Sequence, residues 1–221
     1  AKPFLSALSM SFTVCDAFLS QADVRAFETL FSALTSSGVT IFAASGDTGV
    51  AGCNSGTAVL SLASAGFPAT SPLVTAVGGT ALTTDSAGNR TQEIAWAKTP
   101  PFTTSSSGGG KSRVFVRPPW QSALAVAPDN ARLVPDVALT ASTVDFYING
   151  LDLPAGGTSA SSPLWAAFVA LVNHQLVQSG TVKQPIGFLN PMLYQLGGTS
   201  AFRDIADGRV NDWVDGAGNV L

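Results

Sequence analysis

The sequence predicts an α/β protein, in which a mainly parallel sheet is flanked by helices in three layers. The first observation is an apolar run at residues 4–12, followed by an amphipathic helical pattern and a second apolar run at residues 39–44. A strand–helix–strand order of this kind makes the two strands parallel. The second observation is a series of short apolar runs, separated by turns and followed by one long apolar helix. This order is typical of one layered domain.

The first helix has clear end signals. It begins at Ser20, with Asp23 three residues later as a capping-box partner, and it ends at Gly38. A short strand over residues 73–77 is expected to end at Gly78 and Gly79.

The middle of the chain reads as strands and loops. An antiparallel pair over residues 80–84 and 92–96 surrounds a turn, and residues 113–116 are extended. Residues 144–148 and 151–153 flank Asn149-Gly150, which is a strong hairpin signal.

The second helix covers about residues 160–178, with Pro163 in its first turn, where proline is tolerated. Residues 164–172 are apolar on every side. We therefore expect this helix to be central and buried.

Composition excludes several classes of protein. The chain of 221 residues is 46% hydrophobic and has only 11 basic and 14 acidic residues, which excludes intrinsic disorder. Lys111, Arg113 and Arg117 are the only basic cluster, so we expect no nucleic-acid partner. The longest apolar run is too short to span a bilayer, so we expect no membrane partner. A low content of ion pairs suits a protein that works in acid, either secreted or in an acidic compartment such as a lysosome.

Two cysteines are placed where they could meet. Cys15 follows the first predicted strand, and Cys53 lies nine residues past the second. Neighbouring parallel strands end on the same edge of a sheet, which favours a disulfide between them; two buried thiols are the alternative.

Ser159 lies at the start of the long helix, inside the string Gly-Gly-Thr-Ser-Ala-Ser-Ser-Pro at residues 156–163. Free backbone N–H groups and the positive end of the helix dipole favour negative charge there. This suits an acyl-transfer nucleophile, whose intermediate carries an oxyanion. An ordinary helix cap is the alternative for a lone serine.

Two loops are further candidates. Asp47 lies in the Ser-Gly-Asp-Thr-Gly loop that follows the second strand, at the sheet edge where ligand-binding groups collect; an Asx turn is the alternative. Ser107, Gly108, Gly109 and Gly110 would let an extended peptide approach closely; a flexible loop is the alternative.

The only histidine, His174, follows Ser159 by 15 residues on the same predicted helix. That spacing corresponds to roughly 22 Å along the axis and excludes a Ser-His-Asp triad within this chain. A serine nucleophile without histidine needs another base, and a carboxylate can serve in acid. A neutral carboxyl can also donate a hydrogen bond to an oxyanion.

Motifs in a fixed order resemble the sedolisin family of serine-carboxyl peptidases, which have the subtilisin-like fold. The matching segments are residues 9–12, 45–49, 67–72, 74–80, 107–110, 117–118, 135–137, 157–161 and 187–191. They extend over nearly the whole chain.

The resemblance implies a role for each matching residue. Ser159 would be the nucleophile, and Asp47 the oxyanion-hole carboxylic acid, with the Ser159 N–H as second donor. Residues 107–110 would line the substrate. Asp204 and Ile205 would begin a calcium site, through a carboxylate and a backbone carbonyl. The implied activity is that of an acid-acting endopeptidase or tripeptidyl peptidase on peptide or protein substrates.

The chain departs from the family pattern in two places. The family's base is a Glu with an Asp one helical turn later, but Glu28 is followed by Ser32 and Glu93 by Ala97. The Gly-Trp-Asp segment that completes the calcium site is also missing, although Asp212 and Asp215 lie nearby in a different order.

We therefore expect residues 1–221 to be an incomplete fragment, roughly the C-terminal two-thirds of a sedolisin-like catalytic domain. A companion chain or propeptide with a Glu-x-x-x-Asp helix would supply the base. The rival hypothesis is a non-catalytic binding module that has kept the fold without the base.

Overall fold

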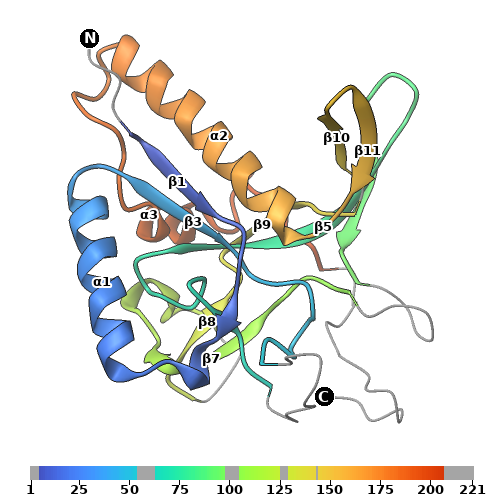
Figure 1. Cartoon of the computed structure of the whole chain (residues 1–221). Coiled ribbons are helices and arrows are strands. Elements are labelled where there is room, and N and C mark those ends of the chain that lie inside the picture. The colour runs from blue at the N-terminus through green and yellow to red at the C-terminus, as the bar shows by residue number, and fades with distance from the viewer. Residues whose placement is uncertain (1–4, 54–62, 98–104, 125–128, 143, 207–221) are drawn as a thin grey trace, which may run out of the picture.

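A mainly parallel sheet lies at the centre of the computed structural model, which describes residues 5–53, 63–97, 105–124, 129–142 and 144–206. Strand β3 (Thr40–Ala44) pairs in parallel with β1 (Ala7–Met10) and β5 (Thr75–Thr84), and β5 also pairs in parallel with β9 (Val137–Thr140). Strand β6 (Arg90–Ala95) is antiparallel to the distal half of β5. The predicted α/β class with a parallel sheet is confirmed (Figure 1).

Helices cover both faces of this sheet. Helix α1 (Gln21–Ser36) begins as predicted, with the Ser20 Oγ accepting a hydrogen bond from the Asp23 N–H at 3.1 Å. Helix α2 (Thr158–Gln178) crosses β1, β3, β5 and β9, and the short helix α3 (Asn190–Leu196) follows it.

Side chains of β3 alternate between two apolar clusters. Ile41 packs in the cluster that contains Phe31 of α1, and Phe42 packs in the cluster that contains Val169 of α2. This alternation is the two-residue period of a strand, and it sets the three-layer order of helix, sheet and helix.

Smaller elements surround the sheet. Short antiparallel pairs are formed by β2 (Val14–Cys15) with β4 (Gly66–Phe67), by β7 (Gly110–Val116) with β8 (Ala131–Val134), and by β10 (Val144–Ile148) with β11 (Leu151–Ala155). Two turns of 3₁₀ helix, Asp16–Phe18 and Pro119–Gln121, lie in the connections.

The predicted end of a strand at Gly78 and Gly79 is wrong. Both glycines lie inside β5, where a Cβ on Gly78 would lie 2.7 Å from the Pro135 side chain and one on Gly79 would lie 2.6 Å from the Ala141 Cβ. The glycines therefore permit close packing instead of ending the strand.

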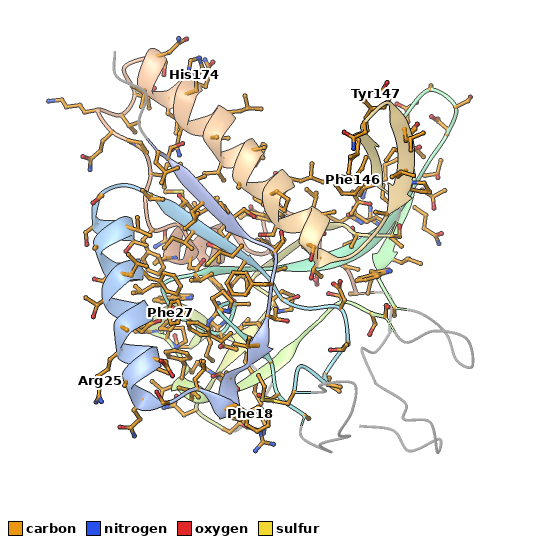
Figure 2. The ribbon with its side chains drawn as sticks, in the orientation of Figure 1. Phe18, Arg25, Phe27, Phe146, Tyr147 and His174 are labelled. Atoms are coloured by element: carbon orange, nitrogen blue, oxygen red, sulfur yellow. A yellow bond between two sulfur atoms is a disulfide. The ribbon has the colours of Figure 1, made fainter. Side chains whose placement is uncertain are left out.

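The prediction that α2 is a central, buried helix is confirmed for its central position and wrong for part of its surface, within the described residues. Its inner face is buried, but Leu164, Phe168 and Leu171 are 39%, 55% and 69% exposed. We call these three side chains the outer face of α2. The hairpin β10–β11, which precedes this helix in the chain, carries Phe146 and Tyr147, which are also exposed (Figure 2).

The predicted disulfide is confirmed. Cys15 and Cys53 are bonded, with 4.4 Å between their Cα atoms. The bond ties β2 to the end of the loop that contains Asp47. None of the helices in the described ranges is long and apolar enough to cross a membrane.

Candidate active site

Ser159 is exposed at the second position of α2, between the buried residues Thr158 and Ala160. Its Oγ donates to the backbone carbonyl of Ser11 at 3.4 Å, and the Ser11 Oγ donates to the Ser159 carbonyl at 2.8 Å. These contacts join the start of α2 to the segment that leaves β1. The exposed hydroxyl lies at the helix terminus that favours negative charge.

Asp47 lies against the same helix terminus. Its Oδ1 accepts hydrogen bonds from both the backbone N–H and the Oγ1 of Thr158, each at 2.8 Å. The backbone carbonyl of Asp47 accepts a hydrogen bond from the Ser106 N–H at 2.9 Å. This bond holds the Asp47 loop against the segment that contains Ser106. The structure thus brings the two predicted catalytic residues close together. Thr158 links them, because it directly precedes Ser159 in the chain and is hydrogen-bonded to Asp47.

A cavity of about 470 Å³ opens at this point. Ser159, Asp47 and Thr158 contribute to one part of its wall. The rest is largely apolar and includes Phe12, Val14, Phe18 and the disulfide of Cys15 and Cys53.

The predicted substrate segment lies behind the Asp47 loop. Ser107, Gly108 and Gly109 are buried, and Gly110 is half-buried. The Gly108 N–H donates to the Gly46 carbonyl at 2.6 Å, and a Cβ on Gly108 would lie 2.2 Å from the Ser45 carbonyl oxygen. None of the four residues is among those that line the cavity, so in this structure they hold the loop, and their contact with substrate stays a prediction.

No second acid or base lines the cavity within the described residues. His174 is exposed near the C-terminal end of α2, far along the helix from Ser159 (Figure 2). Two buried aspartates are occupied elsewhere: Asp16 accepts from Ser64 and Ser112, and Asp136 pairs with Arg132.

The two glutamates also lie away from the cavity. Glu28 is half-buried on α1, which packs on the opposite face of the sheet from α2; burial raises its pKa, and the nearby Ser71 hydroxyl partly offsets that shift. Glu93 accepts a hydrogen bond from Thr80 at 2.9 Å.

The predicted calcium ligands do not form a complete site by themselves. Asp204 is exposed and Ile205 is half-buried, and the described part of the chain contains no cluster of three or more His, Cys, Asp or Glu residues suited to a metal ion. Calcium usually takes six to eight oxygen ligands. Asp212 and Asp215 lie outside the described residues, so calcium binding stays a prediction.

Sequence reasoning identified Ser159 and Asp47 but not Thr158 or Gly157 as their partners. Gly157 has φ of +121°, and a Cβ there would lie 2.6 Å from the Asp47 Oδ2. The signal was present in the Gly-Gly-Thr-Ser string, since a glycine before a helix start often marks a close approach.

Fold and site together define a subtilisin-like protein with a serine at the start of its central helix and a carboxyl beside it. Comparison with known proteins agrees. Kumamolisin from Bacillus sp. (strain MN-32) is 40% identical over 197 residues, which cover 85% of this chain and 33% of the relative. Tripeptidyl-peptidase 1 of Homo sapiens is 34% identical over 218 residues, which cover 90% of this chain and 36% of the relative.

A solved structure agrees as well. Pseudomonas sedolisin, a serine-carboxyl proteinase in complex with two molecules of pseudo-iodotyrostatin, aligns with a TM-score of 0.72 and 28% identity over 86% of this chain and 52% of that chain. No protein-family profile matches the chain. The matched stretch is therefore similar to the sedolisin family of serine-carboxyl peptidases, and it spans about a third of the length of these curated relatives.

Proposed function

We propose that this chain carries the nucleophile and the oxyanion site of an acid-acting serine-carboxyl peptidase. The observation that carries the proposal is the contact of Asp47 with Thr158, which holds a carboxyl beside the helix terminus that presents Ser159. Similarity to kumamolisin and tripeptidyl-peptidase 1 supports peptide or protein substrates.

The reaction has two stages. The Ser159 Oγ attacks the carbonyl carbon of the peptide, and its proton passes to a carboxylate base. The protonated Asp47 and the Ser159 N–H donate hydrogen bonds to the oxyanion that forms. The base then gives its proton to the leaving amine. In the second stage the base takes a proton from water, the water oxygen attacks the acyl-enzyme, and the proton returns to the Ser159 Oγ as the acid product leaves.

The base is supplied by a companion segment, which is a separate chain, a propeptide or another part of a longer polypeptide. Two surfaces support this proposal. The outer face of α2 exposes three large apolar side chains, and β1 is an edge strand of the described sheet. A segment that pairs with β1 and covers α2 would bury both, and exposed edges and apolar patches are usually covered in soluble proteins.

The cavity suits a peptide side chain of apolar character, because Phe12, Val14 and Phe18 line it. Endopeptidase and tripeptidyl-peptidase action differ in their products: internal fragments or tripeptides released from a free N-terminus. The Cys15–Cys53 disulfide and the scarcity of charged residues support an oxidising and acidic location, either outside the cell or in a compartment such as the lysosome.

The direct test is peptide hydrolysis by the full-length protein at about pH 4. Ser159→Ala should lower kcat by about 10³-fold or more, as loss of a nucleophile does. Ser32→Ala, an exposed serine on α1, should leave kcat unchanged. Turnover that persists in Ser159→Ala would overturn the assignment.

A non-catalytic binding module is the second candidate. It is favoured by one observation: within the described residues, the Ser159 Oγ donates only to the carbonyl of Ser11 at 3.4 Å, and no base contacts it. Saturable peptide binding by calorimetry, without turnover by the full-length protein between about pH 3 and 8, would support this candidate over the peptidase.

A further inference from the structure

Thr158 makes an unusual set of contacts for the first residue of a helix. It is fully buried, and its backbone N–H and its Oγ1 both bond to the same oxygen, Oδ1 of Asp47. The residue before it, Gly157, has no side chain to cap the helix. Asp47 therefore caps α2 from a loop that is distant in sequence, and it does so through its hydrogen bonds to Thr158.

The hydroxyl of Thr158 has only one proton to donate. Its oxygen accepts from the Gly46 N–H at 3.1 Å, and the proton has two acceptors within reach: Asp47 Oδ1 at 2.8 Å and the Gly46 carbonyl at 3.1 Å. The contact to Asp47 is the shorter of the two, so we assign the hydroxyl proton to it. Oδ1 then accepts two hydrogen bonds, one from the Thr158 N–H and one from the Thr158 hydroxyl.

The other carboxyl oxygen is in a different environment. Among the described residues, the hydrogen bonds to the Asp47 carboxyl both go to Oδ1, and the missing side chain of Gly157 leaves room for Oδ2. An oxygen that already accepts two hydrogen bonds has little capacity left to carry a proton, whereas a free oxygen has that capacity.

We propose that Thr158 is a positioning residue that assigns the carboxylic proton of Asp47 to Oδ2. Thr158 keeps Oδ1 as an acceptor, so Oδ2 carries the proton and donates it as a hydrogen bond to the oxyanion. This inference rests on the proposed peptidase function, and it explains how the chain fixes the direction of a neutral carboxyl donor.

The test is a double-mutant cycle in the full-length protein with a peptide substrate at about pH 4. Thr158→Val removes the hydroxyl and keeps the branched shape. It should lower kcat by about tenfold or more, within the roughly 10²–10³-fold cost of losing an oxyanion donor, and should change KM less than about twofold. Thr158→Ser, which restores a hydroxyl, should recover most of the loss.

The second arm of the cycle separates positioning from a merely structural role. In an Asp47→Ala background, Thr158→Val should change kcat less than about twofold, because the group that it orients is gone. Thr29→Val, on the exposed side of α1, is the matched control and should have no effect. If Thr158→Val does not fold, as judged by thermal unfolding, Thr158→Ala replaces it with the same expectations.

Three outcomes overturn the inference: unchanged kcat in Thr158→Val, an equal loss in the Asp47→Ala background, or no recovery in Thr158→Ser. If turnover depends on Ser159 and Asp47 while any of these occurs, only the role of Thr158 fails. If the wild-type protein shows no turnover that depends on Ser159, both this inference and the proposed function fail.

Discussion

At the scale of single residues, the site depends on contacts between positions that are far apart in sequence. Asp47 and Thr158 are separated by 111 positions, and two hydrogen bonds join them. Gly157 is the residue type that this contact requires, because its φ of +121° and the nearness of the Asp47 carboxyl both disfavour a side chain.

Gly157→Ala should therefore reduce activity more than stability. The added Cβ would lie 2.6 Å from Oδ2 and must displace the Asp47 carboxyl. We expect kcat for peptide hydrolysis at about pH 4 to fall by at least tenfold, and the free energy of unfolding to fall by about 1–3 kcal/mol from backbone strain.

Gly180→Ala is the matched control for this substitution. Gly180 also has a positive φ, of +73°, but no atom of the described residues lies within 4 Å of its Cβ position. Both variants should lose stability in urea unfolding, and only Gly157→Ala should lose kcat. An equal effect on kcat in the two variants would contradict the role given to Gly157.

The sequence predicted Ser159 and Asp47 because local motifs mark them: a glycine-rich helix start and a polar loop after a buried strand. It did not predict the partners of Asp47, because no local pattern reports which side chain a distant loop will meet. The burial of Ser107–Gly109 was unpredictable for the same reason, since a Gly-rich loop reads equally as an open surface and as a close backbone contact.

At the scale of elements, the two long helices differ in what their sequences could reveal. Helix α1 was predicted from Ser20 onward because its cap and its apolar spacing are local signals. The central position of α2 was predicted correctly, but its complete burial was not, because an apolar pattern reports what a helix prefers to contact and not how much of its surface is covered. Its outer face remains exposed here.

Helix α1 holds a pH-dependent element in Glu28. Burial raises the pKa of its carboxyl above the ordinary value of 4.5, and Oε1 has no hydrogen-bond partner among the described residues. The folded state then binds the proton more tightly than the unfolded state does. Its contribution to stability is complete below the ordinary pKa and is lost as the pH rises through the higher pKa of the folded state.

Glu28→Gln should accordingly raise the free energy of unfolding at pH 7, where the wild-type carboxylate is charged and half-buried. At about pH 3 the two proteins should be close to equal. Urea unfolding at both pH values measures the difference, with the exposed Asp145→Asn on β10 as control. A stabilisation of the same size at both pH values would contradict the titration of Glu28.

The outer face of α2 gives a prediction about the companion segment. Phe168→Ala should lower the free energy of unfolding of the full-length protein by about 3 kcal/mol or more, as expected for a buried aromatic side chain. Leu30→Ala, a residue of similar exposure on α1, should cost much less. Equal and small effects from both substitutions would show that nothing covers α2.

At the scale of the whole molecule, the sheet edge brings together Ser159, Asp47 and a largely apolar cavity. We propose the first as nucleophile and the second as oxyanion carboxyl, and no further acid or base suited to deprotonate Ser159 lines that cavity among the described residues. The fold class, the disulfide and the resemblance to sedolisins could be predicted from sequence, because strand order, cysteine spacing and motif order are all properties of one chain. The source of the proposed base could not be predicted, because neither Glu28 nor Glu93 is followed by an Asp four residues later.

We propose above all that Ser159 forms an acyl-enzyme with the help of Asp47. The most direct measurement is the mass of the full-length protein after it reacts at about pH 4 with a peptide ester substrate and is quenched rapidly in acid, followed by peptide mapping. We expect an adduct with the mass of the acyl group on the peptide that contains Ser159, its near absence in Ser159→Ala, and slower formation in Asp47→Ala. Hydrolysis of the ester without an adduct, or an adduct on another residue, would contradict an acyl-enzyme on Ser159.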